Sequence, residues 1–363
     1  MITLFAIRPK GFNVGNDAIF LGMQRYLFEA FGEVVNIINV PATSRYESHA
    51  KAGLTPQTVW EMNLYGDGVI VGGGNLYENG ELSVDPTALA ALEPPMMLFS
   101  LSHGRVYNRA CELVRRTNAM PAATTKMVND KASQSLARES ATLKYLHDLG
   151  ATDAILGGCP TIFLDRIRDK LPSVGSHGVL ISLRHPSLMS IPSHLQAEVR
   201  TDILQIIEFL KSKGHSKISL LCHDHRDIPF ATSFPDVDFI YRDDIYTFLA
   251  LLDSCELNIT YRLHSALPCL SLGKPMIAIS YDERSLSLLD TVGYGDWNID
   301  MVRCDGVVDA VKDRYERLSE LPEKRRSVAD LWQKLDNGMT ESFGQFAQQV
   351  RGYRDRVNGA TSS

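Results

Sequence analysis

Arg262 and His264 stand two residues apart, between an apolar run ending at Thr260 and a longer apolar segment ending in Gly-Lys-Pro. If 263–272 is a helix, its first turn adds a partial positive charge of about half an elementary unit there. A guanidinium binds phosphate or carboxylate through paired hydrogen bonds. A histidine beside a phosphate is favoured in its protonated form, which suits a proton donor. The pattern predicts an anion site; the alternative is the cap of a surface helix.

Other cationic side chains also follow apolar runs. Arg184 comes directly after the run 179–183, and Arg284 lies four residues after the run 275–280. Parallel strands of an open α/β sheet direct their carboxyl ends to one edge, where ligands bind. These arginines are therefore candidates for the same anion site.

Two further polar segments have less specific patterns. His103 and Arg105 follow the run 96–102 and belong either to a site or to the start of a helix. The segment HDHRD at 223–227 follows the run 217–222. Its spacing matches no familiar zinc signature, and no CxxC pair supports one. We expect a polar edge of a cleft there, and no metal site.

Two glycine-containing loops could bring backbone N–H groups to an anion or a sugar hydroxyl. The loop RPKGFNVGND leads into a helix, and its candidate residues are Gly11, Asn13, Gly15, Asn16 and Asp17, with Asn16 or Asp17 as the N-cap. The alternative is a plain strand-to-helix turn. The second loop is Gly72–Gly74 followed by Asn75. Three consecutive glycines cost chain entropy, which favours a ligand-facing loop over a packing turn.

Short apolar runs alternate with helix-length amphipathic segments, and the series occurs twice. The first series predicts strands at 2–7, 34–40, 68–71, 96–102, 122–125 and 153–156. It predicts helices at 17–31, 105–118 and 129–149. The charged segment 165–178 resembles a linker. The second series predicts strands at 179–183, 217–222, 237–241, 256–260 and 275–280, and helices at 194–213 and 245–255. A polar-rich helix over 325–357 follows.

This alternation predicts an α/β protein with two mostly parallel sheets, because βαβ crossovers place helices on both faces of a sheet. We place an N-terminal domain at 1–165, a second domain at 176–322, and a C-terminal helical segment at 323–358 that packs across both. The strand ends of the two domains then face one cleft.

Composition excludes several classes of protein. The 363 residues carry a formal net charge of -6, so a broad nucleic-acid-binding surface is not expected. No apolar run reaches the ~18–20 residues of a membrane span, and the first residues are typical of a strand rather than a signal peptide. The six scattered cysteines indicate reduced core residues of a cytosolic protein.

Four segments together resemble the polysaccharide pyruvyl transferase family: NVGNDAI at 13–19, GGGNL at 72–76, ISLR at 181–184 and TYRLHSALPCLSLGKPMIAISYDER at 260–284. The resemblance extends from about residue 11 to about residue 292, and the last block is its most specific part. It implies two Rossmann-like domains facing a cleft, as in GT-B glycosyltransferases. It also implies transfer of pyruvate from phosphoenolpyruvate to sugar hydroxyls in exopolysaccharide or cell-wall biosynthesis, which forms a ketal and releases phosphate.

The resemblance also implies roles for individual residues. The donor would bind at Arg184, Arg262, Leu263, His264 and Arg284, with Arg262 and His264 catalytic and His264 as the acid–base group. The sugar acceptor would contact Asn13, Asn16, Asp17, Gly73, Gly74 and Asn75. Two departures concern the acceptor more than the reaction. Gly15-Asn16-Asp17 replaces the family's Gly-Asp pattern, and Glu283-Arg284 stands where a lysine is common.

Two other functions remain open on the residues alone. A GT-B glycosyltransferase using a nucleotide sugar would need an acidic residue for the nucleoside, and Glu283 could serve. A non-catalytic sugar- or anion-binding protein would keep Arg184 and Arg262 without turnover.

The expected partners are phosphoenolpyruvate as co-substrate, with no cofactor, and a sugar acceptor that is either lipid-linked or a finished polymer. We expect a cytoplasmic enzyme, either free or peripheral at the inner membrane face. The basic run EKRR at 323–326 offers a membrane contact or a solvated face. The oligomeric state is left open.

Overall fold

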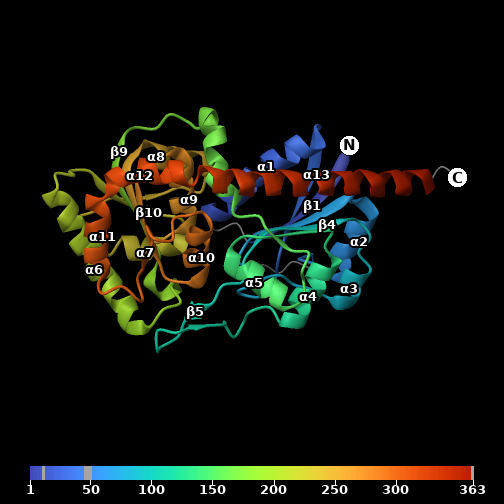
Figure 1. Cartoon of the computed structure of the whole chain (residues 1–363), viewed down its shortest axis with the longest axis horizontal. Coiled ribbons are helices and arrows are strands. Elements are labelled where there is room, and N and C mark those ends of the chain that lie inside the picture. Colours follow the sequence, from blue (N-terminus) through green and yellow to red (C-terminus); the bar gives the residue numbers. More distant parts are fainter. Residues whose placement is uncertain (10–12, 45–50, 361–363) are drawn as a thin grey trace.

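The computed structural model describes residues 1–9, 13–44 and 51–360, and within them two lobes lie side by side (Figure 1). A six-stranded parallel sheet forms the core of the N-terminal lobe. Its central strands are almost continuously apolar, as expected when helices cover both faces. The strand order is β2 (Val35–Pro41), β1 (Ile2–Arg8), β3 (Gly68–Gly74), β4 (Met96–Leu101), β7 (Gln134–Ala137) and β8 (Ile155–Leu156).

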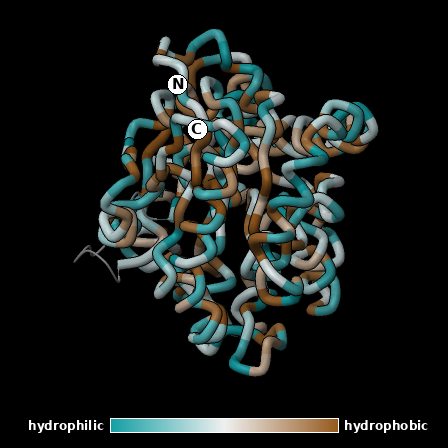
Figure 2. The backbone as a smooth tube through the Cα atoms, turned by 90° about the vertical axis from the view of Figure 1, so that its left-hand side faces the viewer, coloured by the Kyte–Doolittle hydropathy of each residue, from teal (hydrophilic) through white to brown (hydrophobic). Residues whose placement is uncertain are grey.

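A second six-stranded parallel sheet forms the C-terminal lobe. The strand order is β11 (Phe239–Tyr241), β10 (Ile218–Cys222), β9 (His177–Ser182), β12 (Cys255–Thr260), β13 (Met276–Ser280) and β14 (Ile299–Asp300). The predicted α/β fold with two parallel sheets is therefore confirmed. In the end-on view of Figure 2, hydrophobic segments are concentrated toward the middle of the molecule, whereas hydrophilic segments lie mainly on the periphery.

Helices cover both faces of each sheet. Those of the N-terminal lobe are α1 (Val14–Phe31), α2 (Pro56–Tyr65), α3 (Pro86–Ala90), α4 (Ala122–Lys131) and α5 (Ser140–Asp148). Those of the C-terminal lobe are α6 (Ser193–Ser212), α7 (Ile228–Ala231), α8 (Ile245–Ser254), α9 (Leu263–Leu272), α10 (Glu283–Thr291), α11 (Val307–Glu316) and α12 (Leu321–Ser327). One hydrophobic core cluster contains side chains of both sheets and of α1, α8 and α9, so buried apolar contacts join the lobes.

The last helix, α13 (Ala329–Ala360), runs across the molecule, as predicted (Figure 1). Near its start the Trp332 indole donates to the Val292 carbonyl of the C-terminal lobe at 2.9 Å. Further along, Phe343 stacks on Tyr26 of α1 with ring centroids 5.6 Å apart. The helix therefore covers hydrophobic surface on the N-terminal lobe and is anchored to the other lobe.

The predicted helix at 105–118 is wrong. The segment forms a hairpin of β5 (Val106–Tyr107) and β6 (Leu113–Val114) that reaches the C-terminal lobe. The Asn108 side chain accepts from two backbone N–H groups of the turn, which competes with helix formation. The Tyr107 hydroxyl contacts Asp300 at 2.5 Å, so contacts between the lobes override the helical pattern.

The prediction for 122–149 is also wrong in its middle. The predicted strand 122–125 begins helix α4, whose start follows Pro121, a residue with φ fixed near helical values. The predicted helix 129–149 is interrupted by strand β7. A strand of four residues, QSLA, is too short to show alternation, so only its pairing with β4 defines it.

The predicted linker begins in a 3₁₀ segment, Pro160–Lys170, and ends where β9 starts. The domain boundaries proposed from the sequence remain predictions. All six cysteines are free thiols, and four of them are buried. Among the residues described, we find no helix with the length and apolarity needed to cross a membrane.

Candidate active site

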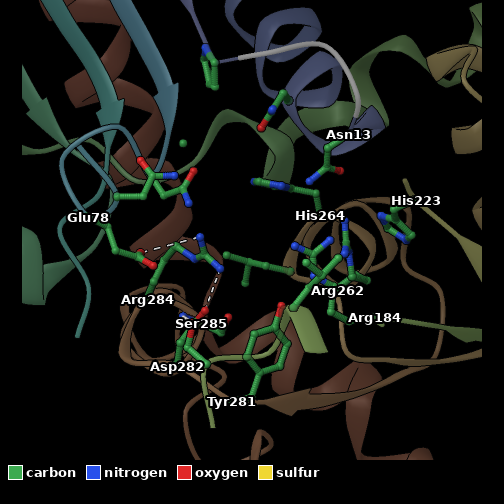
Figure 3. Close-up of a pocket in the computed structure, with 18 of the residues that line it drawn as sticks. Asn13, Glu78, Arg184, His223, Arg262, His264, Tyr281, Asp282, Arg284 and Ser285 are labelled. Carbon is green, nitrogen blue, oxygen red and sulfur yellow. Dashed lines mark hydrogen bonds and ion pairs between the residues drawn. The ribbon is translucent and has the colours of Figure 1, made fainter. Parts of the chain in front are cut away.

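A cavity of about 590 Å³ lies between the lobes at the carboxyl ends of the strands (Figure 3). We call its lining from the first lobe the N-terminal wall and its lining from the second lobe the C-terminal wall. The N-terminal wall includes Asn13, Asn16, Gly74, Asn75, Glu78, Asn79, Arg116, Asn118 and Arg138. The C-terminal wall includes Arg184, His223, Arg226, Arg262, Leu263, His264, Tyr281, Asp282 and Arg284.

The junction of β12 and α9 places Arg262 and His264 in the cavity. Thr260 Oγ1 accepts from the Arg262 backbone N–H at 2.9 Å and donates to the Arg262 carbonyl at 3.0 Å, which fixes the turn. Arg262 is the N-cap residue of α9, so the helix N-terminus points its partial positive charge at the cavity. The helix spans 263–272, as the sequence predicted.

Two arginines of the C-terminal wall share buried carboxylates. Arg262 Nη1 lies 3.4 Å from Asp227 Oδ2, and Arg184 Nη1 lies 3.7 Å from Asp227 Oδ1 and 3.9 Å from Asp224 Oδ2. Within the described chain, Nε and Nη1 of Arg184 have no hydrogen-bond partner. Burial, and then the nearby Arg262, lower the pKa of Arg184, although a guanidinium stays charged at pH 7. The carboxylates thus hold two positive charges together with N–H groups left for an anion.

The 223–227 segment supplies those carboxylates and is a polar edge of the cavity. Asp227 Oδ1 accepts from the His185 backbone N–H at 3.0 Å, and Asp224 accepts from Arg226 Nε at 2.9 Å. Burial opposes ionisation of Asp224, but the hydrogen bonds from Arg226 hold its pKa below the usual value. No group of three or more His, Cys, Asp or Glu side chains arranged for a metal occurs in the described residues.

His264 lies at the contact between the lobes. A Cβ on Gly15 would lie 2.6 Å from His264 Nδ1, so only glycine lets α1 approach the imidazole so closely. Nε2 is buried and has no partner among the described residues. Burial, then Arg138, Arg284 and Arg262, lower the pKa of His264 well below 6.5. The ring is therefore neutral at pH 7, and a role as proton donor requires an anion nearby to raise its pKa.

The two glycine-containing loops contribute part of the N-terminal wall. Asn13 caps α1 by accepting from the Gly15 N–H at 3.0 Å, so it is the N-cap rather than Asn16 or Asp17. Gly73 and Gly74 have φ of 80° and 94°, a conformation that other residues rarely adopt. Of the predicted acceptor contacts, Asn13, Asn16, Gly74 and Asn75 line the cavity.

Asp17 and Gly73 are absent from the lining that the described residues form. Asp17 instead pairs with Arg8 at 2.9 Å, and Gly73 packs against Ile19. The candidate Gly11 lies outside the described residues. The acceptor contacts that we propose therefore use Asn13, Asn16, Gly74 and Asn75, which line the cavity.

Glu78 is a site residue that the sequence reasoning missed. Its side chain is buried, and burial raises its pKa to about 7, despite Arg284 Nη1 at 3.7 Å and Arg116 Nη1 at 3.9 Å (Figure 3). Glu78 lies four residues after Gly74, in the glycine-containing loop that the sequence already indicated as a ligand-facing loop. An acidic residue so close to this strand end could have identified it as a candidate. At neutral pH this carboxyl can either give or take a proton.

Arg138 was also missed, because the strand before it was not recognised. It follows β7 directly and is only 1% exposed, yet Nη1 and Nη2 have no partner in the part of the chain that the structure describes. Its Nε pairs with Glu139 at 3.4 Å, so Arg138 brings a guanidinium with these two partnerless terminal nitrogens to the N-terminal wall.

His103 and Arg105, which the sequence offered for either a site or a helix start, make structural contacts. His103 stacks on Tyr145 with ring centroids 3.7 Å apart, and burial lowers its pKa to about 4. Arg105 forms a bidentate contact with Glu283, whose carboxylate also accepts from the Arg105 backbone N–H at 2.9 Å. The Arg105–Glu283 pair joins the hairpin to α10 and occupies the Glu283 carboxylate.

The sequence matches known proteins in the regions that build this cavity. A family model described as polysaccharide pyruvyl transferase matches residues 13–283. The chain is 23% identical over 256 residues to the amylovoran biosynthesis protein AmsJ of Erwinia amylovora. That match spans 60% of each protein, so the chain corresponds to well under the full length of this relative.

Solved structures resemble the fold at low identity. A UDP complex of S. aureus MnaA has a TM-score of 0.55 at 15% identity, covering 90% of this chain and 91% of that one. The UDP-GlcNAc 2-epimerase of Methanocaldococcus jannaschii has a TM-score of 0.53 at 14% identity, covering 86% and 92%. The predicted GT-B-like architecture is thereby confirmed.

Proposed function

The chain belongs to the polysaccharide pyruvyl transferase family, and we propose that it transfers the three-carbon unit of phosphoenolpyruvate to a sugar. Two hydroxyls of a saccharide attack the same carbon, giving a pyruvate ketal and phosphate. The reaction would serve the synthesis of an extracellular or cell-wall polysaccharide. The match to a polysaccharide biosynthesis protein supports that setting.

The observation that carries this proposal is the convergence of Arg184, Arg262, the α9 N-terminus and His264 on one cavity. Phosphoenolpyruvate is small and highly anionic, so it requires several cationic groups at one place. Guanidinium groups and a helix N-terminus are the standard protein ligands of phosphate. The same groups would stabilise the phosphate as it leaves.

The proton balance of the reaction requires groups that move protons on both sides of the donor. The methylene carbon gains one proton, each sugar hydroxyl loses one, and the bond from carbon to the phosphate oxygen breaks. Phosphate leaves with the remaining proton. His264, whose neutral ring is charged more readily beside a phosphate, would protonate the methylene carbon. Glu78, with a pKa of about 7, is suited to accept a hydroxyl proton.

The sugar would lie against the N-terminal wall. Asn13, Asn16 and Asn75 present neutral amide groups there, and Gly74 leaves room for a ring to approach the backbone. Amides can both donate to and accept from hydroxyls, so they suit a carbohydrate better than an anion. Phosphate release measured with a lipid-linked saccharide and with a finished polymer would show which of the two is the acceptor.

The basic run at 323–326 gives little support to a membrane contact. Arg325 donates to the Ser271 carbonyl at 2.6 Å, Lys324 pairs with Asp296 at 2.5 Å, and Arg326 pairs with Glu323 at 3.0 Å. These cations are already engaged within the protein. The alternative interpretation of the run as a solvated face is therefore favoured.

A nucleotide-sugar glycosyltransferase is the competing proposal, because the similar fold of MnaA has been seen with UDP. The acidic residue that this reaction would need, Glu283, is held by Arg105. We therefore favour phosphoenolpyruvate as the ligand of the C-terminal wall.

Calorimetry with phosphoenolpyruvate, and separately with UDP, tests the choice. Wild type should bind phosphoenolpyruvate without acceptor, and Arg262→Ala should weaken that binding by about 1.5–3 kcal/mol, as expected for a hydrogen bond to a charged group. Binding of UDP alone would select the glycosyltransferase. Binding of both without phosphate release from any acceptor would indicate a binding protein.

A further inference from the structure

Arg138 carries a buried charge that pairs with Glu139 of the same lobe through Nε at 3.4 Å. Its guanidinium lines the cavity, is almost completely inaccessible, and leaves Nη1 and Nη2 without a partner in the described residues. Buried N–H groups that lack hydrogen bonds are unfavourable. Two free N–H groups at a cavity surface therefore point to a ligand that accepts hydrogen bonds.

The neighbours of Arg138 hold it in place without satisfying it. Its backbone N–H donates to the Leu101 carbonyl at 3.1 Å, and its Nε lies 3.4 Å from Glu139 Oε2. Glu139 in turn accepts from the Ser102 hydroxyl at 2.6 Å and from Thr142. The guanidinium is thus held by one lobe through Nε, and Nη1 and Nη2 have no partner among the described residues.

Arg138 faces the donor site from the opposite lobe. After burial, its charge is the largest influence that lowers the pKa of His264, ahead of Arg284 and Arg262. His264 therefore lies between cations of both walls. A donor placed beside His264 would lie between Arg262 of one wall and Arg138 of the other.

We propose that Arg138 binds the carboxylate of the donor, while Arg184, Arg262 and the α9 N-terminus bind its phosphate. The proposal rests on the proposed function and names a second donor anchor from the other lobe. A planar carboxylate matches two parallel N–H groups of one guanidinium. The phosphate, which carries more charge, matches two arginines and a helix N-terminus. The donor then bridges the lobes with its reacting carbons at His264.

The test compares ligands that carry one or both anionic groups. Calorimetry without acceptor measures the affinity for phosphoenolpyruvate, for inorganic phosphate and for vinyl phosphate. Vinyl phosphate lacks the carboxylate. Arg138→Gln should weaken the binding of phosphoenolpyruvate about 10- to 100-fold. The affinities for the other two ligands should stay within about twofold of wild type. Arg262→Gln should weaken all three. Arg109→Gln, at an exposed residue of the hairpin, is the matched control and should change none.

The outcomes that contradict the inference are distinct from failure of the proposed function. Equal loss of affinity for all three ligands in Arg138→Gln would mean that Arg138 binds the phosphate. Unchanged donor affinity with a raised KM for the sugar would assign Arg138 to the acceptor. If wild type binds no phosphoenolpyruvate, the proposed function itself is wrong. Should Arg138→Gln not fold, Arg138→Lys keeps the charge but loses the paired N–H groups and should show the same selective loss.

Discussion

On the C-terminal wall of the cavity two arginines share one buried carboxylate, whereas on the N-terminal wall one buried carboxyl faces two arginines from different lobes. Arg184 and Arg262 share Asp227, whose distances of 3.7 and 3.4 Å fix both guanidinium groups before any ligand binds. On the N-terminal wall, the buried Glu78 carboxyl lies 3.7 Å from Arg284 and 3.9 Å from Arg116, and its pKa is raised to about 7. Both walls have buried polar atoms without partners among the described residues, so the difference lies in the carboxyl groups: Asp227 holds an anion floor on one wall, and Glu78 titrates near neutral pH on the other.

The largest effect is expected from removing the His264 imidazole, which lies between the two walls. His264→Ala should lower kcat by about 10²–10⁴-fold, the usual contribution of a positioned acid–base residue. Donor affinity should change much less, because Arg184 and Arg262 remain. Phosphate release gives kcat, and calorimetry gives the affinity. A kcat within threefold of wild type would remove His264 from the chemistry.

The next test breaks the anion floor. Asp227→Asn keeps an acceptor for the His185 N–H but removes the charge between two buried arginines, so it should cost about 3 kcal/mol of unfolding free energy in urea. The control Asp309→Asn breaks an exposed pair with Lys312 and should cost at most about 1 kcal/mol. Equal effects of the two substitutions would show that the floor is not preorganised by its carboxylates.

The N-terminal wall is tested by pH through Glu78. Its pKa is about 7 in the folded protein against an ordinary value of 4.5, so the folded state binds the extra proton between these pH values. Wild-type stability should therefore fall as pH rises from 4.5 through 7, by up to about 3 kcal/mol from this group.

Glu78→Gln should abolish this loss, so the variant gains stability relative to wild type at pH 8 and not below pH 4.5. Urea unfolding across that range measures the difference, with the exposed Glu93→Gln as the control. A stability difference between Glu78→Gln and wild type that does not vary with pH is the result that would falsify the assignment. In activity, Glu78→Gln should also remove the titration near pH 7 from kcat/KM.

The smallest expected effect concerns the contact between the walls. Gly15→Ala would place a methyl group 2.6 Å from His264 Nδ1 and should cost about 1–3 kcal/mol of stability while lowering kcat. Gly344→Ala in α13, where a Cβ meets nothing within 4 Å in the described chain, should instead stabilise by up to about 1 kcal/mol. Thermal unfolding and turnover of both variants decide whether the α1–α9 contact is as tight as described.

The C-terminal wall could be predicted from the sequence because its residues follow long apolar strands. Helix α9 was located at 263–272, since its apolar run ends at Gly273, which adopts the left-handed conformation that terminates a helix. The Arg262 position followed from that boundary. The pairing of Arg262 with Asp227 could not be predicted, because it depends on how β10 and β12 lie across the sheet.

The N-terminal wall was harder to predict, because two of its elements depend on contacts distant in sequence. β7 is only four residues long, so Arg138 appeared to lie within a helix. The hairpin after β4 is held by Ser190 and Asp300 of the other lobe, which local propensity cannot indicate. Glu78 required knowledge of burial, which gives the carboxyl its raised pKa.

Helix α13 also has a consequence for how the protein is made. The N-terminal sheet is complete once Leu156 has been synthesised, but Phe343 covers Tyr26 and Phe99 only after most of the C-terminal lobe has followed. At about 5–20 residues per second, the ribosome leaves that aromatic surface bare for roughly 10–40 s. The nascent N-terminal lobe therefore exposes apolar surface of the kind that chaperones bind, and we expect chains stalled before α13 to be captured by them more than finished ones.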